Sequence, residues 1–496
     1  MTIRVLFELR AALDGHSGIP QETRLLFRGL AGMDGVDVVG MIQSSNLIVE
    51  PGLPMRRGRI VRGIPEEEQI DRLSRVVVSL QQGPTSHRLE HIRKRILKLF
   101  RPAGAVLRSL FGGKVSLGAF DPMHFKDFIW RGLFAKSLPD DDFALVTSKS
   151  FRVLRWPWSV LHAIGVVTAQ FGRALYARLD TRGIEVMLVE TPFPGRVARP
   201  TKMIVRYHDA IPLLMPHTIK DRGYHRAAHF QALLRNARDG AWFACVSEAT
   251  RQDLLSVLPQ VAERTVTIPN MVSHHFFPEA ADDSRIPEII WSWKSRRAPY
   301  EGGAPIPEAE TVGGFPYLLM VCTIEPRKNH LALLEAWEQL RSLEFEHLHL
   351  VFVGSPGWDH ATILARCSPW LQRGGLHLLE NVPSSDLRLL YRHARATVCP
   401  SFGEGFDFPG IESMRCGGVV AASDIPVHRG VFGEACEYFS PYSSEDIARA
   451  LRALIGSESV ARRAALVEQG ARVAAQYLSE RVLPQWSEFL RRVSES

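Results

Sequence analysis

Residues 396–423, ATVCPSFGEGFDFPGIESMRCGGVVAAS, contain two short apolar segments separated by a glycine-rich loop and a helical segment. The apolar segments, 396–400 and 418–423, have the length of buried strands, and GIESMRC between them predicts a short helix. A strand, a crossover helix and a second strand form a parallel unit, because the crossover returns the chain to the same end of the sheet. The stretch therefore predicts a parallel sheet that is covered on both faces.

The same alternation continues in both directions along the chain. In the C-terminal half, strands are expected at 317–323 and 348–354, and helices at 329–341, 384–394 and 444–455. In the N-terminal half, strands are expected at 3–9, 36–42, 185–190, 202–209 and 241–247, with a helix at 21–32. Ser247 is expected to cap the helix that follows it. These patterns predict an α/β protein of two doubly wound, Rossmann-like domains that face a central cleft.

Composition shifts suggest the domain boundaries. Residues 1–291 are expected to form the N-terminal domain, interrupted by a basic insertion at about 51–180. Residues 292–312, rich in glycine, proline and charge, are the expected linker to a nucleotide-binding domain at 313–478. The last helix, 479–496, is expected to pack back on the N-terminal domain.

The bulk composition limits the class of protein. The chain has 496 residues, which is too long for one ordinary core, and its formal net charge of +7 suits anionic ligands without arguing for nucleic acid. Six cysteines form no CxxC pair and no metal-like spacing, so we expect free thiols in a reducing compartment. The N-terminus does not read as a signal peptide, and no apolar run reaches the length of a membrane span.

The insertion contains a segment with an unusual charge balance. Residues 86–114 carry eight Lys or Arg and one Glu. The resulting balance of +7 equals the formal net charge of the whole chain. Leu89, Ile92, Ile96, Leu99 and Phe100 would share one face of a helix. The pattern fits docking on an anionic membrane, and it fits equally a surface helix packed on its own domain. A cytoplasmic location, peripheral at the inner face of the plasma membrane, is the corresponding expectation.

Two cations follow the expected strand at 317–323. In CTIEPRKNH (322–330), Arg327 and Lys328 stand beside the start of a helix that Asn329 is expected to cap. A basic pair at this edge of a parallel sheet can hold a diphosphate and stabilise the charge on a departing nucleoside diphosphate. Taken alone, Arg-Lys is more often a solvated basic turn.

Two glutamates follow the expected strand at 396–400. Glu404 lies in the loop and Glu412, eight positions later, lies about one turn into the next helix. Gly405 would let the backbone approach a ligand closely. Carboxylates accept sugar hydroxyls, so one acid could hold a hexose and the other a ribose. The alternative is an ordinary helix start with acids attracted by its dipole.

Together these stretches resemble the retaining glycosyltransferases of family 4, which have the two-domain GT-B fold. The resemblance rests on TIEPRKNHLALLEAW, on the E-x7-E pair within SFGEGFDFPGIESM followed by GGVVAASDIPVHRG, and on VRYHDAIPLLMP. It spans most of residues 313–460, and in the first half only the N-terminal turn and residues 200–270. No part of the insertion is covered.

The resemblance implies roles for matching residues. Glu404 would contact the transferred sugar near the reacting centre, Glu412 would bind the donor's ribose, and Arg327 and Lys328 would bind its diphosphate. His208 would approach the donor sugar. The catalytic group implied by the resemblance is Glu404, His208, Arg327 and Lys328, and Glu412 belongs to the substrate-binding residues.

Further residues would bind substrate. Gly405, Phe406 and Asp407 would supply loop contacts, Asp209 would lie beside His208, and Gly18 would belong to a glycine loop over the phosphates. Thr323, in the turn before the basic pair, completes the expected substrate-binding set. Two positions depart from the family pattern: Cys322 stands where glycine is usual, and GIPQE replaces a sequence nearer GIGRY.

The sequence also offers a weaker metal-site signal. Asp140 and Asp142 in PDDDF could hold a metal as in the other glycosyltransferase fold, but they precede rather than follow the expected strand FALVTS (143–148). A surface turn is favoured, and neither a metal nor another cofactor is expected.

The sequence thus predicts a retaining glycosyltransferase that moves a hexose, with mannose from GDP-mannose as the first choice and a UDP-sugar as the next. The acceptor would be a hydroxyl of a glycan or a lipid-linked acceptor in surface polysaccharide synthesis. Retention by same-face attack and retention through an enzyme-bound intermediate both fit the residues. Two alternatives stay open: a GT-B sugar-nucleotide epimerase, and a non-catalytic GT-B scaffold that docks on a membrane.

Overall fold

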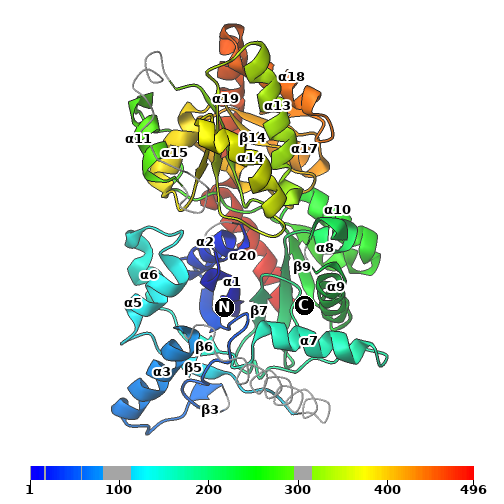
Figure 1. Ribbon diagram of the computed structural model, residues 1–496. Coiled ribbons are helices and arrows are strands. Elements are labelled where there is room, and N and C mark those ends of the chain that lie inside the picture. The colour runs from blue at the N-terminus through cyan, green and yellow to red at the C-terminus, as the bar shows by residue number, and fades with distance from the viewer. Residues whose placement is uncertain (1, 16–17, 57, 82–112, 220, 295–314) are drawn as a thin grey trace.

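The computed structural model describes residues 2–15, 18–56, 58–81, 113–219, 221–294 and 315–496. Figure 1 shows two layered α/β units, with the N-terminal unit below and the C-terminal unit above. Both chain ends lie in the lower unit. The expected helix at 86–114 lies almost entirely outside the described residues, as does most of the expected linker.

The N-terminal unit is built on an eight-stranded sheet of order β10-β9-β8-β7-β1-β2-β6-β5. Its strands are β1 (Ile3–Glu8), β2 (Val36–Ile42), β5 (Gly118–Phe120), β6 (Phe151–Val153), β7 (Val186–Val189), β8 (Lys202–Tyr207), β9 (Trp242–Cys245) and β10 (Thr265–Thr267). All neighbours pair in parallel except β5 and β6. The central strands are apolar on both faces and buried, as a sheet covered on both sides requires.

The C-terminal unit is built on a six-stranded sheet of order β13-β12-β11-β14-β15-β16. Its strands are β11 (Tyr317–Val321), β12 (His349–Val353), β13 (Leu376–Leu379), β14 (Ala396–Cys399), β15 (Val420–Ser423) and β16 (Glu437–Phe439). Every neighbouring pair is parallel, so the carboxyl ends of the strands share one edge. The doubly wound α/β arrangement that the sequence predicts is confirmed.

Helices cover both sheets. In the N-terminal unit the longer ones are α2 (Ile19–Ala31), α3 (Glu66–Gln81), α7 (Trp158–Ala169), α9 (Arg222–Arg238) and α10 (Glu248–Val257). In the C-terminal unit they are α13 (His330–Leu343), α14 (Ala361–Arg373), α15 (Ser384–His393), α16 (Phe408–Arg415), α17 (Pro426–Phe432), α18 (Ser444–Ile455) and α19 (Val460–Ala474). Ser247 caps α10 as expected, because its side chain accepts a hydrogen bond from the backbone NH of Thr250.

Two helices cross between the units. Helix α20 (Ser479–Glu495) follows the C-terminal unit but buries Val482, Trp486 and Leu490 in the core beneath β1 and α2. Helix α11 (Ile286–Ser292) precedes the C-terminal sheet and packs on α15, where the indole NH of Trp293 donates to Asp386 Oδ2 at 2.7 Å. These two crossings attach each unit to the other.

The segment 51–180 does not interrupt the N-terminal sheet as a separate insertion. Strands β5 and β6 within it extend the sheet beyond β2. Helix α5 (Lys126–Ile129), the helical turn Trp130–Phe134 that follows it and helix α6 (Phe143–Thr147) place Ile129, Phe134 and Val146 in the same core as β1. The sequence gives little sign of this, because β5 and β6 are short and pair in an antiparallel direction.

The strand expected at FALVTS is wrong, because residues 143–147 form α6. Three aspartates, 140–142, precede it in a 3₁₀ turn, and acids at a helix N-terminus favour the helical form. Asp142 is buried and pairs with Arg28 at 2.9 Å. This pairing gives the aspartate a structural partner, in agreement with the expected turn.

Candidate functional site

The carboxyl ends of both sheets meet where the two units touch. The loop after β14 carries Glu404 and Gly405, and the end of β8 carries His208. A Cβ added to Gly405 would lie 1.8 Å from the His208 carbonyl oxygen, so the two backbones are in direct contact. Residues that lie about 200 positions apart in the sequence are thereby brought to one place.

Three charged side chains form the centre of this junction. Glu404 Oε2 lies 2.8 Å from Arg327 Nη1, and Glu404 Oε1 lies 2.6 Å from Lys328 Nζ. Arg327 also pairs with Glu325 at 2.8 Å and donates to the Gly403 carbonyl at 2.6 Å. The Glu404 side chain is only 8% exposed. The basic turn predicted for a diphosphate and the first predicted glutamate are therefore one ion cluster.

Electrostatics fixes the charges of this cluster. Burial would raise the pKa of Glu404, but the adjacent Arg327 and Lys328 outweigh it and hold the pKa well below its usual range. Burial would lower the pKa of Lys328, and Glu404 reverses that shift. All three groups are ionised at neutral pH, so the Glu404 carboxylate is shared by two cations, of which Arg327 also contacts Glu325.

The second predicted glutamate, Glu412, is held from both sides. It is on α16 and buried, with Oε1 accepting from Gln21 Nε2 at 2.8 Å and Oε2 accepting from the Tyr391 hydroxyl at 2.9 Å. Gln21 belongs to α2 of the N-terminal unit, so this hydrogen bond joins the units. Burial raises the pKa of Glu412 to about 7, which leaves the carboxyl only partly ionised near neutral pH.

His208 is oriented by a buried acid. Its Nε2 lies 3.0 Å from Oε2 of Glu190, at the carboxyl end of the neighbouring strand β7. Burial, followed by the charge of Arg206, lowers the pKa of His208 to about 4. Burial also raises the pKa of Glu190 to about 8. Both groups are therefore uncharged near neutral pH, and the shared hydrogen bond fixes the imidazole.

A hydroxyl pair seats the Gly405 loop on the N-terminal unit. The Gly405 carbonyl accepts from Ser247 Oγ at 2.7 Å and from Thr250 Oγ1 at 3.3 Å. Thr250 Oγ1 also lies 3.3 Å from the His208 carbonyl. Ser247 thus acts both as a helix cap and as a contact between the units.

The other predicted residues surround this centre at different distances. Phe406 is buried against Phe408 and Tyr477, and the Asp407 carboxylate turns away to buried His428 at 3.0 Å. Asp209 Oδ1 accepts from the Ile211 backbone NH at 3.0 Å.

Gly18 and Thr323, two further predicted residues, lie in turns outside the regular helices and strands. Gly18 begins α2 at a φ of 71°, with open space where a Cβ would lie, three residues before Gln21. Thr323 is half-buried beside Gly357, whose Cβ position is 2.6 Å from Thr323 Cγ2.

The expected side-chain cap by Asn329 is wrong. Asn329 occupies the N-cap position of α13 with a φ of 62°, but its side-chain amide donates to the carbonyls of Pro400 and Pro441. The bond to Pro400 ties the basic turn to the loop that carries Glu404, and the bond to Pro441 ties it to the loop after β16. The side-chain amide of Asn329 therefore holds the basic turn in place and does not cap the N-terminus of α13.

Sequence reasoning missed Gln21, Glu190 and Tyr391. Glu190 had a usable signal, because it is an acid at the end of an apolar strand next to the strand that ends in His208. Gln21 lies in GIPQE, which departs from the family pattern, and Tyr391 is an ordinary aromatic position on α15. Their partners lie 18 to 391 residues away, so only the fold pairs them.

Within the described ranges, no group of three or more His, Cys, Asp and Glu side chains is placed to hold a metal ion. In the same ranges, no helix combines the length and apolar character needed to cross a membrane.

The sequence carries a recognisable domain. Residues 306–473, about a third of the chain, match the model of the family Glycosyl transferases group 1. O-antigen chain mannosyltransferase B from Escherichia coli is 28% identical over 246 residues, which are 49% of this chain. The chain covers 57% of the length of that relative, little more than half.

Solved structures share the fold over the whole chain. Sucrose-phosphate synthase from Thermosynechococcus elongatus superposes with a TM-score of 0.58 at 14% identity, covering 99% of each chain. Anabaena HepE in complex with UDP-glucose gives a TM-score of 0.56 at 12% identity, covering 99% of this chain and 100% of its own. The predicted GT-B fold is confirmed.

Proposed function

We propose that this chain, which carries a Glycosyl transferases group 1 domain on a GT-B fold, is a glycosyltransferase of surface polysaccharide synthesis. It would move a hexose, mannose in the first instance, from a nucleoside diphosphate donor to a hydroxyl of a glycan or lipid-linked acceptor. The similarity to O-antigen chain mannosyltransferase B from E. coli supports this class of reaction and this choice of sugar.

The observation that carries the proposal is the ion cluster at the junction of the units. Arg327 and Lys328 are cations whose side chains are only 12% and 14% exposed, and Glu404 is their shared carboxylate partner. A diphosphate offers the same cations more negative charge than one carboxylate does, so it can replace Glu404 in contact with them. The pair would then stabilise the charge that develops on the leaving diphosphate. Glu404, released from the pair, would face the sugar.

The contacts of Glu412 indicate how the nucleoside would be held. A ribose presents two neighbouring hydroxyls, and the ionised carboxylate of Glu412 can accept both. Its Oε1 is already occupied by Gln21 across the junction. Ribose would therefore exchange with the Gln21 amide, and donor binding would be coupled to movement of α2.

His208 would contact the donor sugar from the N-terminal unit. Its imidazole is neutral near pH 7 and is oriented by Glu190, so it would act as a hydrogen-bonding group and not as a cation. Retention of the anomeric configuration is part of the proposal. The expected independence from metal is also part of it, because Arg327 and Lys328 would take the charge-neutralising role.

The direct test is transfer by the purified full chain. GDP-mannose and UDP-sugars are supplied with glycan acceptors, and nucleoside diphosphate release is measured together with the linked product, with and without EDTA. We expect Glu404→Ala and Lys328→Ala to abolish transfer in folded protein. Glu468→Ala is the matched control, because Glu468 pairs with Arg472 on the surface of the same unit.

The outcomes separate the candidate functions. Hexose transfer that resists EDTA and fails in both site variants supports the proposal. Epimerised donor without transfer would identify an epimerase instead. Full activity in Glu404→Ala or Lys328→Ala, or loss of activity with EDTA, would contradict the assignment of the site.

The cellular setting belongs to the proposal as well. Enzymes that use cytoplasmic nucleotide sugars and lipid-linked acceptors work at the inner face of the plasma membrane, and residues 86–114 would supply peripheral contact there. Deleting this segment and measuring vesicle binding tests the contact separately from transfer to a soluble acceptor.

A further inference from the structure

A basic pocket lies at the opposite edge of the N-terminal sheet from His208. Lys202 begins β8 at this pocket and Tyr207 ends the same strand next to His208. Six residues of strand span about 20 Å, so the pocket is separate from the junction of the units. The cavity measures about 390 Å³, within the range of small-molecule sites.

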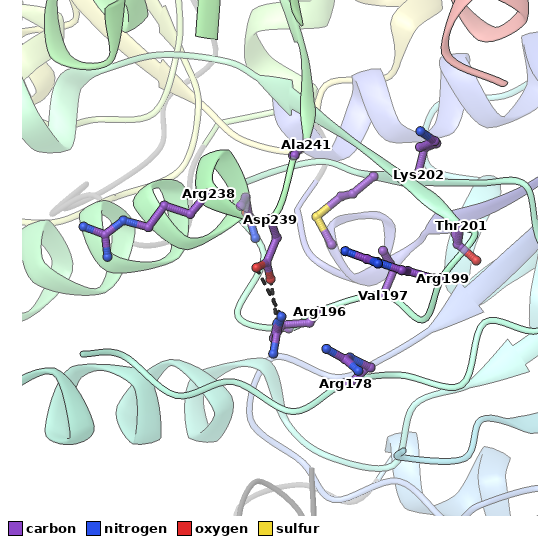
Figure 2. Close-up of a pocket in the computed structure, with 13 residues that line it drawn as sticks. Arg178, Arg196, Val197, Arg199, Thr201, Lys202, Arg238, Asp239 and Ala241 are labelled. Atoms are coloured by element: carbon purple, nitrogen blue, oxygen red, sulfur yellow. Dashed lines mark hydrogen bonds and ion pairs between the residues drawn. The ribbon is translucent and has the colours of Figure 1, made fainter. Parts of the chain in front are cut away.

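Cations dominate the lining of this pocket. The charged residues are Arg178, Arg196, Arg199, Lys202 and Arg238, with Asp239 as the acid among them. Figure 2 shows the side chains of Arg178, Arg196 and Arg199 gathered on one side of the pocket, while Arg238 extends away along α9. The pocket therefore presents three guanidinium groups and one ammonium group against one carboxylate.

The backbone holds the arginines in place. Arg178 and Arg196 face each other across a parallel bridge, in which the Leu179 NH donates to the Arg196 carbonyl at 2.8 Å. Buried Asn236 hydrogen-bonds both the NH and the carbonyl of Phe193, at 2.8 and 3.0 Å. The segment that leads to Arg196 is therefore fixed, which lowers the entropic cost of binding a ligand.

The following turn is fixed in a similar way. Thr181 and Thr201 share a hydrogen bond of 2.7 Å in the interior, and Thr181 Oγ1 accepts from the Ala198 backbone NH at 3.1 Å. Arg199 and Lys202 flank these anchored positions. Their charged groups are thus displayed by a rigid turn and not by a loose loop.

The charges of the pocket are only partly compensated. Asp239 pairs with Arg196 at 2.6 Å and is shared with Arg235 at 3.0 Å. In the described part of the chain, neither Arg199 nor Lys202 forms an ion pair. Like charges held close together repel, and an anion with several oxygens would relieve that repulsion while accepting forked hydrogen bonds.

We propose that this pocket binds a phosphate-bearing anion through Arg178, Arg196, Arg199 and Lys202. Guanidinium forks match the geometry of phosphate oxygens, so each arginine can donate two parallel hydrogen bonds to the ligand. The ligand is either the headgroup of an anionic phospholipid or a soluble phosphate compound. The site goes beyond the proposed glycosyl transfer and does not depend on it.

The test measures binding of inorganic diphosphate to the full chain by calorimetry at low ionic strength. The pocket variant is Arg199→Ala/Lys202→Ala, which breaks no ion pair in the described structure. The control variant, Arg366→Ala/Arg373→Ala on α14, removes the same charge from the C-terminal unit. Any binding at Arg327 and Lys328 is common to all three proteins. Loss of two charged contacts is expected to weaken the pocket's affinity about tenfold or more in the pocket variant only.

Vesicles distinguish the two sources of the ligand. Vesicles of phosphatidylglycerol and phosphatidylcholine that displace diphosphate from the wild type, and bind the pocket variant more weakly, identify a lipid headgroup. Diphosphate binding that vesicles do not displace identifies a soluble phosphate compound. Identical diphosphate isotherms for wild type and pocket variant overturn the proposal. Arg199→Ser alone, at an exposed position, repeats the test if the double variant does not fold.

Discussion

Replacing Glu404 by Gln should destabilise the C-terminal unit yet enlarge its response to phosphate ligands. The substitution keeps the shape of the side chain and removes the charge that compensates buried Arg327 and Lys328. Removing one partner of a buried ion pair costs about 3–5 kcal/mol. Arg327 retains Glu325 at 2.8 Å, so the cost falls mainly on Lys328 and is expected near about 3 kcal/mol.

This loss of stability should lower the melting temperature of the C-terminal unit. For a unit of this size, about 3 kcal/mol corresponds to a decrease of about 6–12 °C. Inorganic diphosphate or a nucleoside diphosphate would restore the missing negative charge. The ligand should therefore raise the melting temperature of Glu404→Gln by more than it raises that of the wild type.

Thermal unfolding followed by circular dichroism, with and without ligand, measures both effects. The control is Glu338→Gln, whose partner Arg366 is 57% exposed, and its cost should stay below about 1 kcal/mol. A melting temperature of Glu404→Gln equal to that of the wild type would refute the reasoning. So would a ligand response no larger than that of the wild type, because both follow from the same uncompensated cations.

Three further predictions concern the junction and the core. Donor affinity should rise with pH and level off above about 7. Burial raises the pKa of Glu412 to about 7, and only the ionised carboxylate accepts both ribose hydroxyls. In a calorimetric titration from pH 6 to 8, Glu412→Gln should bind the donor weakly at every pH. Gln21→Ala should strengthen donor binding by up to about tenfold, because ribose no longer exchanges with an existing hydrogen bond; weaker binding would show that Gln21 itself contacts the donor. Trp486→Ala should cost about 3–5 kcal/mol and lower the melting temperature of the N-terminal unit, because the indole is fully buried in its core; an unchanged melting temperature would deny that α20 stabilises this unit.

The sequence predicted the parts of the fold that carry strong local patterns. The strands around Val5, Val205 and Val398 each contain a run of consecutive apolar residues, and this is a property of parallel strands buried on both faces. The strand predicted at 143–148 is wrong, because a short apolar segment has no periodicity of its own and the preceding aspartates favour a helix. The sequence did not show that the expected insertion at 51–180 contributes β5 and β6 to the N-terminal sheet, because the pairing of these strands is a long-range choice.

The sequence by itself determined the chemistry of the candidate site. An acid pair spaced eight apart and an adjacent Arg-Lys turn follow strands of one parallel sheet, whose carboxyl ends must share an edge. Only the tertiary structure decided the partners: Gln21 on Glu412, Glu190 on His208, and the Gly405 backbone against the opposite unit. Local patterns encode which edge a residue occupies. Contacts between two separately folded units depend on how their surfaces meet, and no local spacing in the chain carries that information.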